Sequence, residues 1–408
     1  MSAAGGARRL RFNPFSEEFR RDPYAVYRRL REAEPMHRVL GMWVLTRYAD
    51  VAAVLRDRRF SSRLFPDAIE QHQPKGGQRF HRIESFIAKA IVFTDNPDHS
   101  RLRRLVGGCF SPEAVEAERP HVEALVDRLL DRALAAGGME AMGEFADEIP
   151  LHVTADRLGL PEDGRRQVRE WTHLIRFLLD PSLMAPDDYV RVEAAAAAFM
   201  EYVRPLVGER RARPTADVIT RLLESRAGDD RLSEDEVILT CIMSFVAGHE
   251  TTKYLIGNGL LALLQHPAQR ARLRGEPGRV GAAVDEVLRY DAPLQQTKRV
   301  ALEDVDVGGQ TIRRGDKVLL CLGAANHDPA RFERPEVFDI GRTDNAHFGF
   351  GYGMRACLGG ALAHLEAAVA LSRFTARAPD PALTDEPLAW QDHSRILRGL
   401  TRLPIRFG

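Results

Sequence analysis

The residues most able to do chemistry lie in a glycine-rich segment near the end of the chain. Phe350 to Gly359 reads FGYGMRACLG, and ALAHLEAAVAL follows it with a helical composition. Glycines let the backbone turn sharply and let a flat group approach closely. Cys357 then lies at or just before a helix N-terminus, where the dipole and unpaired N–H groups favour a thiolate over a thiol. A thiolate in a protected apolar setting is a good axial ligand for haem iron, although a lone cysteine is more often a buried structural residue.

A second polar group interrupts an apolar stretch in the middle of the chain, where residues 247–251 read Ala-Gly-His-Glu-Thr. A glycine beside a polar β-branched residue can loosen the hydrogen bonds of a buried helix and admit water. Oxygen activation needs room for O₂, a hydroxyl to hold it and an acid linked to a proton supply, and Thr251 and Glu250 could serve as these groups. The alternative is a kinked core helix in which Thr251 bonds back to a backbone carbonyl. We interpret His249 as a satisfied polar residue turned away from any cofactor.

These motifs resemble the cytochrome P-450 family. The segment from Phe350 to Gly359 meets every fixed position of its haem-binding signature, F-G-x-G-x-[RH]-x-C-x-G, and residues 247–251 match its pattern [AG]-G-x-[DE]-T. The resemblance implies haem b (iron protoporphyrin IX), with Cys357 as the axial ligand of the iron. It also implies that Phe350 packs against the cofactor and that Arg355 pairs with a haem propionate. Gly359 belongs to the same cofactor-binding segment.

Further segments extend the resemblance along the chain. The run NPDHSRLR, residues 96–103, resembles the family segment D-x-P-x-H-x-x-x-R. His99 and Arg103 are four residues apart on a helix, so both can point at one propionate. Arg299 resembles another propionate partner. The alternative for all three is an ordinary solvated basic face.

A pair of opposite charges resembles the family motif E-x-x-R. Glu286 and Arg289 are three residues apart and share one helix face, where they can pair. An exposed pair would contribute little, but the resemblance implies a buried structural pair with no catalytic role. Family members often carry a basic residue where Val337 stands, and Arg342 could take its place.

The substrate pocket can be predicted only from the resemblance. It implies a lipophilic small molecule, such as a secondary metabolite, that is hydroxylated or epoxidised with one oxygen atom from O₂. The residues predicted to line the pocket are Phe86, Ile87, Val92, Met243, Ser244, Ala247, Leu294, Gln295, Gln296, Thr297 and Ile396.

The electrons must come from another protein, because the chain is too short for a fused reductase and shows no second cofactor motif. The resemblance therefore implies a ferredoxin or flavodoxin partner with its reductase. We expect it to dock on the side that carries Cys357, with Arg101, Arg104 and Arg342 as basic contacts.

A long helix must position the polar segment 247–251. Ser233 to Glu236 fits a capping box at its start, and the helical pattern continues to about Gln265, just before Pro267. Roughly 30 residues at 1.5 Å each give ~45 Å, enough to cross the whole molecule. Because its first half is apolar on all sides, the helix should be buried.

Strands are expected toward both ends of the chain. Met36 to Arg47 reads as two short strands around Gly41, and β-rich portions are predicted near 36–47, 297–321 and 400–407, with a helical remainder. No repeat or linker is visible, which favours a single domain over residues 1–408. The predicted fold class is mainly α with small β-sheets. The resemblance implies a cytochrome P-450 fold, with the haem buried between the long central helix and the cysteine loop and helix.

The composition excludes several other classes of protein. Lys+Arg and Asp+Glu both number 58, so no overall charge excess attracts nucleic acid or an anionic membrane. The four cysteines form no C-x-x-C motif, which gives no support to a zinc ribbon, an iron–sulfur cluster or a disulfide framework. The opening MSAAGGARRLRFNPF lacks the apolar region of a signal peptide, and the longest apolar run, Val237 to Gly248, is shorter than the ~20 residues of a membrane span. We expect a cytoplasmic protein with no membrane anchor and no nucleic-acid partner.

Three rival functions remain open at this point. A non-catalytic haem-thiolate sensor or carrier would not need Glu250 and Thr251. A peroxide-driven peroxygenase would be expected to carry Arg-Pro in place of that pair. A haem-free helical scaffold would be colourless when purified.

Overall fold

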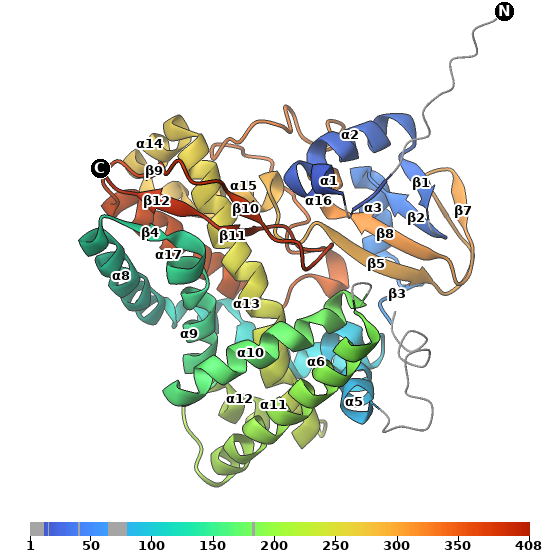
Figure 1. Ribbon diagram of the computed structural model, residues 1–408. Coiled ribbons are helices and arrows are strands. Elements are labelled where there is room, and N and C mark those ends of the chain that lie inside the picture. Colours follow the sequence, from blue (N-terminus) through green and yellow to red (C-terminus); the bar gives the residue numbers. More distant parts are fainter. Residues whose placement is uncertain (1–11, 15, 40, 64–79, 182–183) are drawn as a thin grey trace, which may run out of the picture.

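A computed structural model of the protein describes residues 12–14, 16–39, 41–63, 80–181 and 184–408. Most of the first fifteen residues, on which the expectation of no signal peptide rests, lie outside these ranges. Helices dominate, and the strands gather mainly on one side of the molecule (Figure 1). The fold is therefore mainly α with small sheets, as predicted.

The helices of the first half are α1 (Glu17–Arg21), α2 (Pro23–Ala33), α3 (Tyr48–Arg56), α5 (His81–Lys89), α6 (Asp98–Gly107), α7 (Pro112–Glu116), α8 (Arg119–Ala136), α9 (Glu148–Arg157), α10 (Arg165–Ile175) and α11 (Pro186–Ala212). Those of the second half are α12 (Val218–Glu224), α13 (Glu234–Gln265), α14 (Pro267–Gly275), α15 (Val280–Tyr290), α16 (Leu322–Ala325) and α17 (Gly360–Arg377). Shorter turns are η1 (Ile91–Phe93), η2 (Gly108–Phe110), η3 (Met142–Ala146), η4 (Glu162–Gly164), η5 (Arg176–Leu179), η7 (Pro277–Arg279) and η8 (Gly353–Arg355). The strands are β1 (Met36–Val39), β2 (Met42–Leu45), β3 (Phe60–Ser61), β4 (Gly138–Glu140), β5 (Gln296–Ala301), β6 (Val305–Val307), β7 (Gln310–Ile312), β8 (Lys317–Cys321), β9 (Ala382–Leu383), β10 (Ala389–Trp390), β11 (Leu400–Arg402) and β12 (Pro404–Arg406).

The largest sheet pairs strands from residues 36–61 with strands from residues 296–321, in the order β1-β2-β8-β5-β3. Strands β2 and β8 run parallel, while the other neighbours are antiparallel. Gly41, between β1 and β2, has a φ of 74°, a left-handed conformation that glycine adopts without strain. The sheet places β5 next to the candidate site described below.

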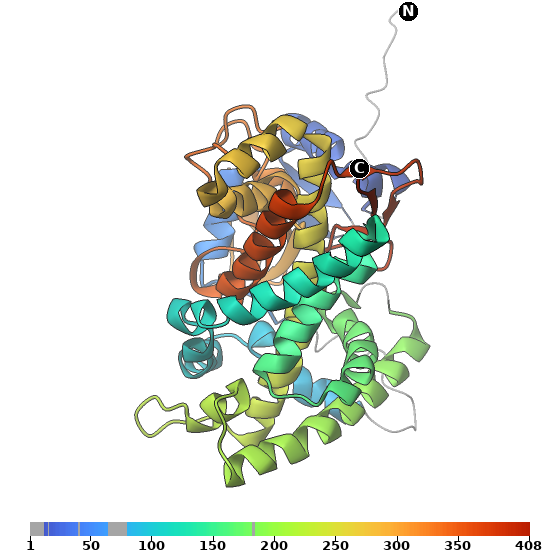
Figure 2. The ribbon, with the colours of Figure 1, turned by 90° about the vertical axis from the view of Figure 1, so that its left-hand side faces the viewer.

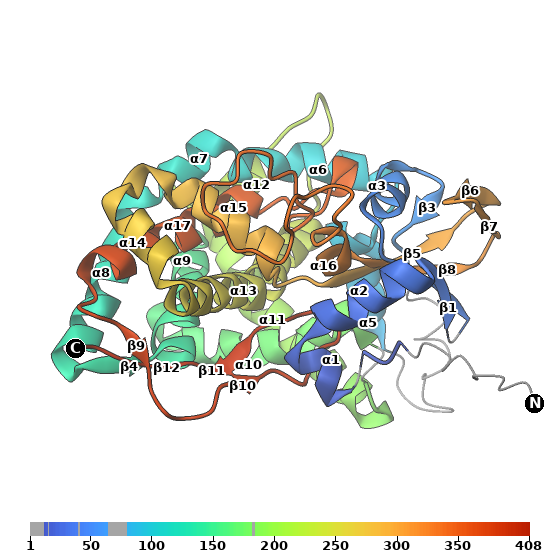
Figure 3. The ribbon, with the colours of Figure 1, turned by 90° about the horizontal axis from the view of Figure 1, so that it is seen from above.

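Helix α13 is the longest helix and runs through the middle of the molecule. Its N-cap Ser233 accepts a hydrogen bond from the amide of Glu236, whose carboxylate accepts one from the amide of Ser233 in return. This is the predicted capping box, and the helix ends at Gln265 as expected. Seen from above, α13 lies between α15 and α17 on one side and α10 and α11 on the other (Figure 3).

Two apolar clusters pack on different halves of α13. Its first half, with residues such as Ile238 and Phe245, packs with α5, α10 and α11. Its second half, with residues such as Leu255 and Leu260, packs with α8, α15 and α17. Figure 2 shows α17 (red) crossing close to α8 (teal) within this second cluster. Residues 247–252, which include the polar side chains of this helix segment, fall between the two clusters.

The strand prediction was incomplete in the regions expected to be helical. Gly137, with a φ of 74°, ends α8, and β4 and the π-helical turn η3 follow it. Short strands β3, β9 and β10 also lie outside the predicted β-rich portions. Residues 400–407 form two strands in different sheets, because β11 pairs with β10 while β12 pairs with β4 and β9. Strands of two or three residues are too short to show a clear alternation in sequence.

Candidate active site

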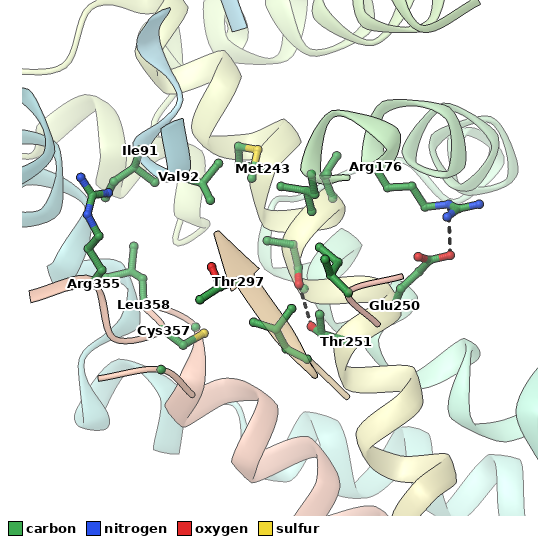
Figure 4. Close-up of a pocket in the computed structure, with 18 of the residues that line it drawn as sticks. Ile91, Val92, Arg176, Met243, Glu250, Thr251, Thr297, Arg355, Cys357 and Leu358 are labelled. Carbon is green, nitrogen blue, oxygen red and sulfur yellow. Dashed lines mark hydrogen bonds and ion pairs between the residues drawn. The ribbon is translucent and has the colours of Figure 1, made fainter. Parts of the chain in front are cut away.

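Cys357 lies in a tight loop that leads into α17. Gly351 and Gly353 both have a φ of 70°, a conformation that costs a residue with a Cβ atom free energy. The amide of Cys357 donates to the carbonyl of Phe350 at 2.8 Å, and the amide of Ala356 to that of Gly353 at 3.0 Å. The loop therefore holds the thiol at the wall of a cavity of about 860 Å³ (Figure 4).

The ionisation of Cys357 differs from the sequence prediction. Burial raises the pKa of the thiol, and the opposing effects of the Gly359 amide and the charge of Arg103 do not outweigh it. Burial therefore outweighs the expected preference for the thiolate, and α17 begins only at Gly360, three residues beyond the sulfur. A metal ion bound to the sulfur would reverse the balance, since a coordinated thiol loses its proton outright. The thiol is exposed toward the cavity, as a ligand to haem iron must be.

Three arginines and a histidine line the same cavity, from three elements: His99 and Arg103 on α6, Arg299 on β5 and Arg355 in η8. Burial, with the charges of Arg355 and Arg103 acting in the same direction, lowers the pKa of His99 to about 4, so the imidazole is neutral at pH 7. Burial also lowers the pKa of Arg299 to about 10, with Arg355 adding to the effect. The neighbouring arginines thus disfavour the charged forms of His99 and Arg299, which is the situation that bound anions relieve.

The groups of the protein that contact these side chains do not balance all of their positive charge. Arg355 donates to the carbonyl of Thr94 at 2.8 Å and pairs with Asp95. Arg299 donates at 2.7 Å to the carbonyl of the neighbouring Lys298, a neutral group. Asp95, which pairs with Arg355, is the one carboxylate that pairs with any of these four side chains in the described part of the chain. The arrangement fits the two propionates of a haem.

His99 and Arg103 lie on one helix face, but they act differently. Arg103 donates from Nη1 to the carbonyl of Ala356 at 2.7 Å, so it ties α6 to the loop of Cys357. His99 is buried, and its Nδ1 has no hydrogen-bond partner among the described residues. An unpartnered buried nitrogen facing the cavity is available to an anionic ligand. Phe350 and Gly359 also line the cavity, and a Cβ atom at Gly359 would meet open space.

On the opposite wall, α13 presents Thr251 to the cavity. The Thr251 hydroxyl donates to the carbonyl of Ala247 at 2.7 Å. This is the back-bonded geometry that the sequence left as an alternative, and the same hydroxyl still lines the cavity.

Glu250 points away from Cys357, toward Arg176 (Figure 4). Its Oε1 lies 3.2 Å from Nε of Arg176, 3.3 Å from Nδ1 of His173 and 3.6 Å from Nε2 of His393. Burial alone would raise the pKa of Glu250, but its interactions with these three side chains outweigh burial and hold it well below the ordinary value. Glu250 is therefore a carboxylate at neutral pH.

His249 does not line the cavity and is fully buried, but its Nδ1 has no hydrogen-bond partner among the described residues, so the prediction of a satisfied side chain is wrong. Its Nε2 lies 3.2 Å from Oδ1 of Asp147, which also pairs with Lys253 at 2.9 Å. Burial raises the pKa of Asp147, but His249 and Lys253 lower it well below its ordinary value.

The predicted pair of Glu286 and Arg289 is fully buried and bidentate, with two N–O distances of 2.8 Å. Arg342 adds a third charge, since its Nε lies 3.3 Å from Oε2 of Glu286. It therefore replaces the missing basic residue at Val337, whose carbonyl accepts from Arg289 instead. These contacts fix the irregular segment before the cysteine loop onto α15.

The predicted pocket residues divide into two groups. Those that line the cavity are Val92, Met243, Ser244, Ala247, Leu294, Gln296, Thr297 and Ile396. Phe86, Ile87 and Gln295 do not. Phe86 and Ile87 face the apolar cluster between α5 and α11, and the Gln295 amide donates to Tyr24 and to the carbonyl of Ala292. A helix and a strand each have two faces, and the resemblance did not determine which one meets the cavity.

Several residues that line the cavity were not predicted from the sequence. Arg176 and His393, which hold Glu250, come from η5 and from the turn between β10 and β11, and nothing in the sequence places these segments together. Glu366 did carry a signal, because it is a charged residue within the apolar run of α17. It lines the cavity, and burial raises its pKa to about 8.

Two of the three predicted docking arginines are occupied. Arg101 is held by Asp230 at 2.8 Å and Glu236 at 2.6 Å, and Arg342 pairs with Glu286. Arg104, on the same helix as Arg103, is exposed.

The loop, the cationic cluster and the polar interruption of α13 together define a haem-thiolate enzyme. The profile of the family Cytochrome P450 matches residues 173–377. The chain is 38% identical over 404 residues to the biotin biosynthesis cytochrome P450 of Bacillus subtilis (strain 168), covering 96% of this chain and 98% of the relative. It is 36% identical to the cytochrome P450 monooxygenase PikC of Streptomyces venezuelae, covering 98% and 94%.

Solved structures agree with these matches. The crystal structure of CalO2 superposes with a TM-score of 0.90 at 36% identity, covering 98% of this chain and 99% of that one. That of P450BioI, in complex with acyl carrier protein ligated to hexadec-9Z-enoic acid, has a TM-score of 0.88 at 37% identity, covering 96% and 99%.

This chain belongs to the cytochrome P450 family, and it is a monooxygenase with a haem-iron cofactor. When bound, the haem iron and its thiolate activate O₂, so that one oxygen atom enters the substrate and the other leaves as water. The described residues include no helix long and apolar enough to cross a membrane.

Proposed function

We propose that this monooxygenase hydroxylates or epoxidises a lipophilic secondary metabolite of medium to large size. The observation that carries the proposal is the largely apolar wall on the α13 side of the cavity of about 860 Å³, which the haem and the substrate would share. Val92, Met243 and Leu294 supply apolar surface, and Thr297 can orient a polar group of the substrate. The Gln296 amide is already used, because it donates to the hydroxyl of Tyr27 at 3.1 Å.

The names of other relatives support this substrate class. They include a polyketide biosynthesis enzyme of Bacillus subtilis, the 6-deoxyerythronolide B hydroxylase of Saccharopolyspora erythraea and a vitamin D(3) 25-hydroxylase of Pseudonocardia autotrophica. These relatives support a lipophilic metabolite as the substrate of this chain.

The proposed cofactor is haem b, held by the groups that the cavity brings together. Cys357 would bind the iron, and the surplus positive charge of Arg299, Arg355 and Arg103 would neutralise the propionates, with His99 as a further hydrogen-bond partner. Unpaired buried carboxylates would be costly without such partners. Phe350 would pack against the ring.

Two residues of α13 would handle oxygen and protons. Thr251 would release the carbonyl of Ala247 and turn its hydroxyl into the cavity, where it could hold a proton for the oxygen chemistry that the haem supplies. Glu250 would pass protons into the cavity. A peroxide-driven enzyme or a sensor has no use for this acid and alcohol, so the pair favours the O₂ reaction.

Electrons would come from a ferredoxin or flavodoxin that docks on the face near Cys357, with Arg104 as a contact. We expect Arg104→Glu to lower turnover severalfold at low ionic strength, with the difference closing as salt is added. Arg132→Glu is the matched control. It lies on α8 beside Asp131, which pairs with Arg377 at the far end of α17 from Cys357. Equal turnover and salt dependence in the two variants would remove Arg104 from the contact.

A ferrous–CO difference spectrum tests haem-thiolate ligation, and Cys357→Ser should abolish the thiolate band. A library of macrolactones, sterols and long-chain fatty acids, with small polar metabolites as controls, then tests the substrate class. Low-to-high-spin shifts with the lipophilic compounds are expected. Shifts with the polar compounds alone would overturn the proposed substrate class.

A further inference from the structure

The carboxylate of Glu250 has one oxygen turned outward and one turned inward. Oε1 meets the three cationic side chains described above, His173, Arg176 and His393. Oε2 is buried and has no hydrogen-bond partner among the described residues. The side chain is only 4% exposed, yet the residue lines the cavity. Protons that reach Glu250 from solvent must therefore pass through a neighbouring group.

His173 is the neighbour that connects Glu250 with solvent. Its side chain is 42% exposed, compared with 12% for Arg176 and 28% for His393. His393 is farther from Oε1, and its Nε2 also lies 3.1 Å from the hydroxyl of Tyr254. Arginine does not release its proton in proteins, whereas imidazole gains and loses one near neutral pH.

Other charged groups near this cluster are already paired. On α13, His249 and Lys253 both face Asp147, which also lies 3.1 Å from Arg169 of α10. The ring of His249 lies 6.1 Å from that of His173, centroid to centroid. On α17, Glu366 lines the cavity as a second acid, and because it is almost fully buried it has no direct connection with solvent.

We propose that His173 is a proton-relay residue that carries protons from solvent to Glu250. The inference rests on the proposed function, in which Glu250 supplies protons to the oxygen site. In each transfer, the imidazolium gives its Nδ1 proton to Oε1 of Glu250 and becomes neutral. The carboxyl group of Glu250 then turns so that its protonated oxygen faces the cavity, releases that proton there and returns to the carboxylate, while His173 takes a proton from solvent.

The stoichiometry of the reaction sets how often the relay must run. Each O₂ needs two protons and two electrons to give one oxygenated product and one water, and the redox partner supplies the electrons. Because interactions with its neighbours keep the pKa of Glu250 low, the carboxylate stores no proton between turnovers. Two transfers through His173 per turnover would supply the two protons.

The test compares His173→Gln with two controls in the haem-loaded enzyme with its redox partner. His173→Lys keeps a positive charge beside Glu250 but does not exchange protons readily near neutral pH. His152→Gln removes another imidazole that pairs with a glutamate, since Nε2 of His152 lies 3.0 Å from Oε2 of Glu148 on α9, away from the cavity wall. Turnover, its pH profile and the solvent isotope effect are measured for each.

We expect His173→Gln to lower turnover about tenfold and to raise the solvent isotope effect. This is less than the 100-fold or greater loss typical of removing an acid–base group, because His393 leaves a second route. His173→Lys should be equally slow, and His152→Gln should match the wild type. Full activity in His173→Lys would show that only the ion pair matters, and an unchanged His173→Gln would also overturn the relay.

A measurement independent of turnover follows the carboxylate itself. In infrared difference spectra referenced to Glu250→Gln, the Glu250 carboxylate should become protonated at higher pH in His173→Gln than in the wild type. An unchanged titration would contradict the contact on which the relay depends. The ferrous–CO band and the substrate spin shift should persist in His173→Gln. Their absence from the wild type would instead contradict the proposed function.

Discussion

Thr251 has two possible hydrogen-bond partners, its own helix and a ligand in the cavity. Its hydroxyl donates to the carbonyl of Ala247 at 2.7 Å and lines the cavity. We expect Thr251→Ala to lower the yield of product per electron pair about tenfold and to raise the release of hydrogen peroxide, because the proton supply loses its hydroxyl. Product and peroxide are measured against cofactor consumption.

Thr251→Ser is the control, since serine keeps the hydroxyl and should retain most of the coupling. If Thr251→Ala gave product as efficiently as the wild type, the hydroxyl would be a helix-bonding group only. The sensor or carrier function would then deserve a renewed test.

The two arginines that pair with Glu286 should differ in how much stability is lost when each of them is replaced. Arg289 is fully buried and makes two 2.8 Å bonds to the carboxylate, so Arg289→Met leaves buried Glu286 with Arg342, at 3.3 Å, as its remaining arginine partner. We expect a loss of about 3–5 kcal/mol in the free energy of unfolding. Arg342→Met should cost less, about 1–2 kcal/mol, because Glu286 keeps Arg289.

Urea unfolding of the haem-loaded protein measures these losses. Arg334→Met is the matched control, because its side chain is 69% exposed and should change stability by under about 0.5 kcal/mol. Equal losses for Arg289→Met and Arg342→Met would show that the three charges act as one unit.

At the scale of elements, the cap of α13 should matter because both core clusters depend on this helix. Ser233→Ala removes the side chain that accepts from the amide of Glu236. We expect a loss of about 1 kcal/mol in unfolding free energy. Ser16→Ala removes the equivalent cap of the five-residue helix α1 and should cost less in the same urea measurement, since fewer contacts depend on that helix. A larger effect at Ser16 would contradict this ranking.

The sequence predicted the elements that carry local signals. Ser233 and Pro267 marked the ends of α13, and Gly41 marked the turn between β1 and β2. The strands that it missed consist of two or three residues whose pairing partners are far along the chain, such as β4 with β12. Local sequence cannot specify a pairing of that kind.

The same distinction explains the outcome for the site. The cysteine loop and the polar interruption of α13 are contiguous motifs, so they could be read directly. Phe86 and Gln295 were misplaced because only the packed structure decides which face of an element meets the cavity. The cluster around Glu250 was missed because its members come from three separate segments.

On the scale of the whole molecule, the cavity separates the two apolar clusters on α13 and carries charge on its walls. Cations face the cysteine loop, while Glu250 and Glu366 lie on α13 and α17. Glu250 is compensated by its neighbours. Glu366 is fully buried, its Oε2 has no hydrogen-bond partner among the described residues, and it must stay protonated to remain there at low cost.

The difference between the two acids predicts a pH dependence of stability. Burial raises the pKa of Glu366 from 4.5 to about 8, so between these values the folded state holds a proton that the unfolded state has lost. The stabilising effect of this proton is complete below pH 4.5 and is lost as pH rises toward 8, by up to ~1.4 kcal/mol per pH unit. Glu366→Gln mimics the protonated acid at every pH. Its thermal midpoint should therefore exceed that of the wild type by a margin that widens from pH 5 to pH 8. Glu162→Gln, which removes an exposed acid, should follow the wild-type curve, and parallel curves for Glu366→Gln and the wild type would show that Glu366 ionises without cost in the folded protein.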